Sequence, residues 1–118
     1  MQRINMQGTC STGGAATLTS SKAIFGKLYA VRWVDGTLAD GVDAVLSVIR
    51  SDATVTLLTL TTANDDKMYY PLILAQDNAG ANLTAIYQEQ IVDGYLQLAI
   101  TAGGNAGVGG AIVYIDPE

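Results

Sequence analysis

Residues that could perform chemistry are few in this chain and do not form a recognisable reactive set. Cys10 is the only cysteine, and the 118 residues include no histidine that could activate a thiol or hydroxyl nucleophile. Glu89 and Asp93 could act as a glycosidase pair only if they converged on a cleft. Because no constellation meets the requirements of an active site, we predict a structural thiol and a protein that is not an enzyme.

Acidic residues offer the next possible chemistry, because closely spaced carboxylates can hold calcium. Asp35, Asp40 and Asp43 lie near one another, but their spacing is not that of an EF-hand loop. Asp35 and Asp40 each precede glycine, and Asp-Gly pairs are turn signals. We therefore favour turn and cap roles over a metal site here, and likewise for Asp65 and Asp66.

A glycine-rich stretch, GGNAGVGG at residues 103–110, has the composition of a phosphate-binding loop. A P-loop continues into Lys-Ser or Lys-Thr and a helix, whereas this stretch continues into the strand-like sequence AIVYI. No cofactor is therefore expected. We predict instead a flexible hairpin tip, free to become ordered against a neighbouring subunit.

Aromatic residues could form a surface for stacking sugars. The candidates are Trp33, Tyr69, Tyr70, Tyr87 and Tyr95. For Trp33 we favour a core position, since it lies in a strongly strand-forming segment. Tyr69 and Tyr70 precede Pro71, which restricts them to a sheet edge or to a segment outside a sheet. Because adjacent residues of an extended chain point to opposite sides, one tyrosine can anchor the fold while the other faces outward.

Composition indicates a protein whose surface is partly covered by other subunits. Charged residues make up 14% of the chain, against roughly 25% in typical globular domains, and 49% of the residues are hydrophobic. We therefore expect a homo-oligomer, either a dimer or a trimer. The net charge of −5 and the lack of a basic cluster argue against nucleic-acid binding. No segment reads as an export signal or membrane span, which predicts synthesis in the cytoplasm.

Alternating apolar runs predict an all-β fold. The last third of the chain reads as a long β-hairpin, with strands at 95–101 and 111–115, and with Leu96, Leu98 and Ile100 on its core face. Further strands are expected at 15–20, 26–34, 42–49, 54–61 and, along an edge, 68–72; on the strand at 26–34, Tyr29, Val31 and Trp33 should share one face.

Two segments leave alternatives open. Residues 3–7 could be a short first strand or part of an extended N-terminal arm spanning 1–14, and residues 83–90 could form a helical turn or a strand after a loop at 75–82. The sum is about eight strands in one domain, 1–118. This number predicts an antiparallel β-sandwich or jelly roll.

Several short segments, in this order along the chain, resemble the small structural proteins encoded in the head gene clusters of tailed bacteriophages. The resemblance runs nearly end to end, although the acidic ending IDPE and Cys10 depart from it. Its segments are RIN at Arg3 to Asn5, GKLYAVRWV at Gly26 to Val34, ADGVD at Ala39 to Asp43, YYP at Tyr69 to Pro71, and ITAGGNAGVGGAIVYI at Ile100 to Ile115.

This resemblance implies a virion protein that decorates or cements the outside of the capsid where capsomers meet, with the major capsid protein as its partner. The expected contacts are an N-terminal arm, the edge at residues 68–71 and the glycine-rich loop. Their residues would be Arg3, Ile4, Met68, Tyr69, Tyr70, Pro71, Asn105 and Val108. Two alternatives remain open: a glycan- or receptor-binding module of a fibre or tail, and a few-copy connector or tail component.

Overall fold

The computed structural model describes residues 1–117 and is all-β. Its strands run in sequence as β1 (Gln2–Thr9), β2 (Ala16–Thr19), β3 (Ile24–Val34), β4 (Asp43–Ile49), β5 (Thr54–Leu60), β6 (Lys67–Tyr69), β7 (Leu72–Gln76), β8 (Asn82–Thr101) and β9 (Val108–Asp116). No helix in this part of the chain could cross a lipid bilayer. Residues 3–7 lie in β1 and residues 83–90 lie in β8, so the strand alternative is the one observed for both segments.

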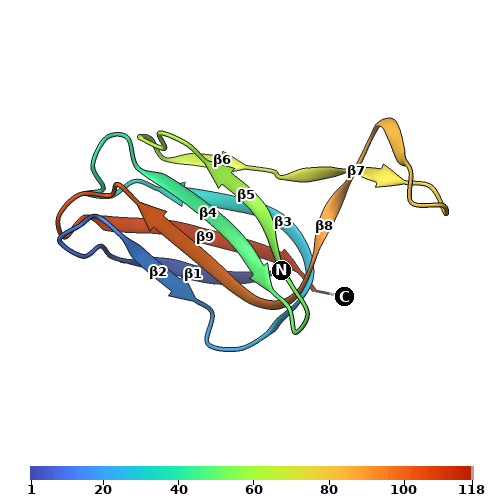
Figure 1. The fold of residues 1–118 in the computed structure, drawn as a ribbon, viewed down its shortest axis with the longest axis horizontal. Coiled ribbons are helices and arrows are strands. Elements are labelled where there is room, and N and C mark those ends of the chain that lie inside the picture. Colours follow the sequence, from blue (N-terminus) through green and yellow to red (C-terminus); the bar gives the residue numbers. More distant parts are fainter. Residues whose placement is uncertain (118) are drawn as a thin grey trace.

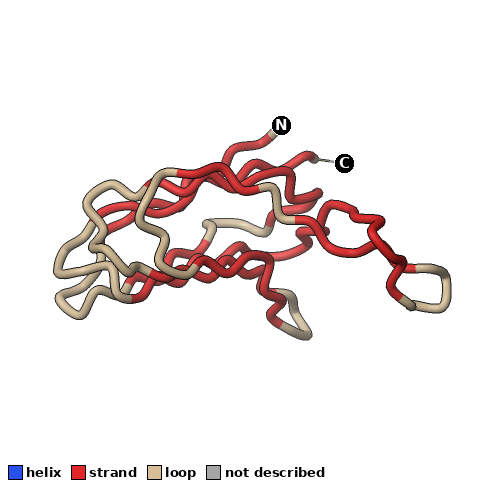
Figure 2. The backbone as a smooth tube through the Cα atoms, turned by 90° about the horizontal axis from the view of Figure 1, so that it is seen from above, coloured by secondary structure: helices blue, strands red, loops and turns tan. Residues whose placement is uncertain are grey.

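The strands form two antiparallel layers with the core between them (Figures 1 and 2). The first sheet has the order β1-β9-β3, and β6 and the middle of β8 share the far edge of β3. The second sheet has the order β2-β8-β4-β5, using the end of β8. This arrangement confirms the predicted antiparallel β-sandwich.

Strand β8 links the projecting β7 with both sheets. Its first residues pair with β7, residues 90–94 pair with β3 in the first sheet, and residues 95–101 pair with β4 in the second sheet. The passage between sheets occurs at Gly94, where a Cβ would overlap the carbonyl oxygen of Ile49. Only glycine allows the two backbones to approach this closely.

The predicted C-terminal hairpin is wrong, because the end of β8, residues 95–101, pairs in the second sheet whereas β9 pairs in the first. The glycine-rich segment between them is long enough to cross the roughly 10 Å that separates packed sheets. Hydrogen bonds hold this crossover: Cys10 N donates to Gly107 O at 2.8 Å, Gly103 N to Gly14 O at 2.8 Å, and Ala39 N to Gly103 O at 2.9 Å. Its glycines therefore serve close packing inside the fold.

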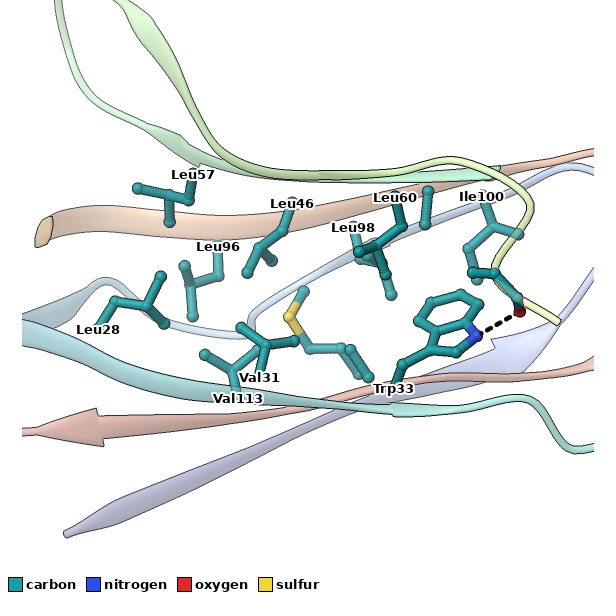
Figure 3. Packing of buried hydrophobic residues seen from close by; sticks show 14 of the residues in the cluster. Leu28, Val31, Trp33, Leu46, Leu57, Leu60, Leu96, Leu98, Ile100 and Val113 are labelled. Carbon is teal, nitrogen blue, oxygen red and sulfur yellow. Dashed lines mark hydrogen bonds between the residues drawn. The ribbon is translucent and has the colours of Figure 1, made fainter. Parts of the chain in front are cut away.

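The core between the sheets is formed by branched aliphatic side chains around one tryptophan (Figure 3). Leu96, Leu98 and Ile100 are buried, as predicted. Trp33 is also buried, and its indole Nε1 donates to the carbonyl oxygen of Ala63 at 2.8 Å. The sandwich therefore satisfies the one polar atom that its largest core residue carries.

One face assignment on β3 is wrong. Val31 and Trp33 are buried as expected, but Tyr29 is exposed. The cause is an irregularity in the pairing of β3 with β9 between Leu28 and Ala30, which breaks the alternation of side chains. Tyr29 consequently lies on the outer surface of the first sheet.

Candidate interaction surface

A hairpin projects from one end of the sandwich. We call residues 72–89 the arm; it consists of β7 and the first part of β8, and it extends well beyond both sheets (Figures 1 and 2). The segment predicted as a loop, 75–82, contains the end of β7 and the turn at the tip. There the Asp77 carboxylate accepts hydrogen bonds from Ala79 N at 2.9 Å and Ala81 N at 3.0 Å, and Gly80 has a φ of 85°.

Large apolar side chains of the arm face solvent. Leu72 and Ile73 on β7, and Ile86 and Tyr87 on β8, are 43–58% exposed. The arm has only two strands, and among residues 1–117 no further layer covers these exposed side chains, although Ile73 lines a depression shared with Val55 and Leu57 near the root. Such two-stranded ribbons are marginally stable in water when nothing covers them.

The root of the arm is fastened to the sandwich. Gln90 is buried, and its side-chain Nε2 donates to the carbonyl oxygen of Leu57 on β5 at 2.8 Å. On the same strand, Asp93 forms an ion pair with Arg50 from the end of β4. These two links join β8 to the opposite sheet and fix the direction in which the arm leaves the body.

One side of the arm continues onto the outer surface of the first sheet. Ile91 pairs with Lys27 and Leu72 pairs with Glu89, so alternation places these four residues on one side. Tyr29 joins through its ring, which meets that of Tyr70 edge to face with centroids 5.9 Å apart. We call this surface the apolar face; its large exposed side chains are Phe25, Tyr29, Tyr70, Leu72, Tyr87 and Ile91.

Lys27 and Glu89 carry opposite charges within the apolar face, and the strand pairing also places Asp116 opposite Lys27 and Asp93 opposite Phe25 on this side. Lys27 and Glu89 line a depression of about 330 Å³ together with Gln88 and Ile91. Among residues 1–117 the ion pair is that of Arg50 with Asp93, so neither Lys27 nor Glu89 is in one. Moreover, Oε2 of Glu89 is shielded from solvent without a hydrogen-bond donor. A buried carboxylate oxygen without a donor is costly, which favours a partner group arriving from outside.

A groove lies between the free edges of the two sheets, where β1 and β2 face each other. Its volume is about 450 Å³, and Arg3, Ile4, Leu18 and Thr19 are among the residues that line it. Ile4 packs against the core, whereas Arg3 is exposed with its guanidinium carbon 5.9 Å from the centroid of the Tyr114 ring. Beside it, β1 presents eight residues of strand edge with one charge and no proline.

The contact residues predicted from sequence do not form one site. Arg3 and Ile4 lie on β1 at one edge of the first sheet, and Met68 and Tyr69 lie on β6 at the opposite edge. Tyr70 and Pro71 follow and lead into the arm. Asn105 and Val108 belong to the crossover and the start of β9.

The prediction that one of the adjacent tyrosines anchors the fold while the other faces outward is confirmed. Tyr69 is half-buried and packs against the core, with the Lys67 ammonium 5.3 Å from its ring centroid. Tyr70 is exposed and belongs to the apolar face. The chain therefore passes from core to surface within two residues.

Acidic residues gather at the loops opposite the arm, where they take part in backbone contacts. The Asp43 carboxylate accepts from Thr62 N at 3.0 Å, and the Asp66 carboxylate accepts from Asp35 N at 2.8 Å. Within residues 1–117, no three His, Cys, Asp or Glu side chains are placed to hold a metal ion. Partial burial, followed by the charges of Asp66, Asp40 and Asp65, raises the pKa of the Asp35 carboxyl above its ordinary value.

The side chains considered above for catalysis, Cys10, Glu89 and Asp93, do not come together as a reactive set among residues 1–117. Cys10 is buried beside the crossover, where a Cβ on Gly103 would meet its sulfur at 2.7 Å. Glu89 and Asp93 both lie on β8, and Asp93 is paired with Arg50. The feature that stands out chemically is therefore the exposed apolar face.

No protein-family model, curated protein or solved structure matches this chain.

The arm itself was missed by sequence reasoning. Its signal was present: two short apolar runs, LIL at 72–74 and LTAIY at 83–87, flank a turn sequence with Asp, Asn and Gly. Reading the second run as ambiguous hid the hairpin.

Proposed function

We propose that this protein is a structural component of a tailed-bacteriophage virion, which binds the outside of the head shell at capsomer junctions and stabilises it. The observation that carries the proposal is a rigid sandwich whose apolar arm and long open strand edges leave apolar groups for other proteins to cover. The resemblance to head-cluster proteins supports the virion as the place where such a surface is used. In this role the protein is made in the host cytoplasm and acts without catalysis or a cofactor.

The groove between β1 and β2 is the part best suited to contact the major capsid protein. An extended capsid segment could add to the free edge of β1 through main-chain hydrogen bonds while its side chains enter the groove. Each contact buries apolar area, at about 25 cal/mol per Å². Because shell sites repeat many times, modest affinity at each site reinforces the whole shell.

The first test is the number of copies of this chain per purified particle, measured by quantitative mass spectrometry against the major capsid subunit. A ratio approaching that of the capsid subunit supports shell decoration. A ratio far below it points to a connector, fibre or tail component, and absence from particles refutes the virion assignment.

Edge variants then test the groove. Asn5 and Gln7 are exposed on β1, so N5E/Q7E adds charge beside the free edge without touching the core. Thr54 and Thr56 are exposed on β5, at an edge of the other sheet, and T54E/T56E is the matched control. The first pair should reduce the number of copies bound to shells, and the control pair should not; equal binding by both removes β1 from the interface.

A second function is favoured by the aromatic residues of the apolar face. Phe25, Tyr29, Tyr70 and Tyr87 are exposed, and surfaces of this kind can stack on sugar rings. The protein would then be a glycan- or receptor-binding module of a fibre or tail. Sugar binding on a glycan array that is lost in Tyr70→Ala would favour this role, and indifference to sugars would favour the shell.

A further inference from the structure

We propose that a second copy of this chain covers the arm. In this arrangement the apolar face of one copy packs against the apolar face of the other, so that each arm lies across the partner's first sheet. The inference goes beyond the proposed function and does not depend on it, because it concerns what the protein does before it meets any shell.

The exposed apolar side chains and the two-stranded architecture of the arm indicate that another protein surface packs against it. Six large side chains of the apolar face, from Phe25 to Ile91, are each at least 45% exposed. Soluble monomers rarely expose so much contiguous apolar surface. A hairpin of two strands also gains too little from its own contacts to stay ordered without a second layer.

A second copy is the partner that is present as soon as the chain folds. A shell becomes available only at assembly, whereas the arm is exposed from the moment of synthesis. A lipid surface fits poorly, because Asp77 and Glu89 are the only charged residues between positions 68 and 92, and anionic membranes attract basic segments.

The apolar face can also match itself, as a two-fold interface requires. Its positive group, Lys27, lies beside the negative Glu89, and neither is in an ion pair within residues 1–117. The other acidic residues on this side are Asp93, which is paired with Arg50, and Asp116, which lies opposite Lys27 on β9. A two-fold rotation about the depression between Lys27 and Glu89 brings Lys27 of one copy to Glu89 of the other. This contact supplies a donor to the shielded Oε2 of Glu89.

The arm is prepared for this contact before association. The hydrogen bond from Gln90 to Leu57 O and the Arg50–Asp93 ion pair already fix its direction. Association therefore has to order only the hairpin beyond this root, which limits its entropic cost.

Sedimentation equilibrium of the full chain tests the inference with a matched pair of variants. Tyr87 and Tyr95 lie on the same strand and are 58% and 45% exposed, but Tyr87 is on the arm and Tyr95 is on the second sheet. The wild type should sediment as a dimer of 12.3 kDa chains. Tyr87→Lys should raise the dissociation constant by about 30-fold or more, the effect of losing a central aromatic contact. Tyr95→Lys should leave it unchanged.

A charge exchange tests the two-fold register and does not depend on how Tyr87→Lys folds. Lys27→Glu and Glu89→Lys should each weaken the dimer, and the K27E/E89K double variant should recover its affinity. Near-ultraviolet circular dichroism of Trp33 verifies the fold of each variant.

Three results would overturn the inference: a wild type that stays monomeric at all concentrations, a trimer, or a dimer that none of the arm variants weakens. Failure of the double variant to recover would overturn the Lys27–Glu89 contact. None of these results changes the copy number in particles, so the virion proposal stands or falls separately.

Discussion

The sandwich body and the arm use the same kinds of residue in opposite ways. On the single strand β8, Leu96 is 0% exposed, whereas Ile86, ten residues earlier, is 54% exposed. Leu96 pairs with Val48 in a regular antiparallel ladder, whereas Ile86 follows Ala85, whose φ is 57°, in the irregular part of the pairing between β7 and β8. The main difference is that a second sheet covers Leu96, whereas no second layer among the described residues 1–117 covers Ile86. Local sequence therefore determines the strand, and the presence of a second layer determines whether its side chains become core.

The largest expected effect distinguishes the two regions directly. Trp33→Ala should lower the free energy of unfolding by about 3–5 kcal/mol, because it empties the centre of the core and leaves Ala63 O without its donor. Tyr87→Ala on the arm should change the stability of the monomer little. Urea unfolding at low protein concentration measures both; equal losses would mean that the arm is part of the core.

The crossing point between the sheets gives the next effect. Gly94→Ala should cost about 3 kcal/mol, because the added Cβ collides with the backbone of Ile49. Gly13→Ala is the control, since its Cβ would meet only Ser11 Oγ, at 3.8 Å. If the Gly94 variant melts like the control, β8 does not pass so close to β4.

The arm root provides an intermediate effect. Gln90→Leu should destabilise the protein by about 1–2 kcal/mol, because the buried Leu57 carbonyl loses its donor. The exposed Gln88 on the same strand supplies the control variant Gln88→Leu. Hydrogen exchange should also show faster exchange in the arm of the Gln90 variant; unchanged protection would show that this hydrogen bond does not hold the arm.

The smallest effect concerns the acidic loops and depends on pH. The folded-state pKa of Asp35 is raised, so the folded protein holds a proton more tightly than the unfolded chain does. Stability from this group is complete below the unfolded pKa of about 3.8 and falls as pH rises through the folded pKa. At neutral pH the ionised Asp35 is therefore unfavourable.

Asp35→Asn should accordingly stabilise the protein at pH 7 by less than about 1 kcal/mol and have no effect near pH 3. Asp52, exposed in the turn between β4 and β5, supplies the control Asp52→Asn. A gain that persists at pH 3 would show that the effect is not due to charge.

Much of the body could be predicted from sequence because its strands alternate or are apolar throughout. The segments around Trp33 and Leu98 were recognised in this way, including their core positions. The pairing of strands was less accessible. A glycine-rich connection fits both a hairpin and a crossover between sheets, and the choice depends on distant partners such as β1 and β4.

The candidate site was harder to predict than the fold. Tyr70 was identified through its neighbour Pro71, which signals an edge. Ile86 and Ile91 gave no such signal, because their burial depends on whether another layer covers them. The exposure of Tyr29 depends on an irregular pairing that a simple alternation rule does not anticipate.

Hydrogen exchange of the wild-type arm as a function of protein concentration tests the central claim most directly. If a second copy covers the arm, amides of residues 72–89 should exchange rapidly in dilute solution and become protected as concentration rises, while amides around Leu98 stay protected throughout. Arm protection that is independent of concentration, at the level of the sandwich, would contradict the account.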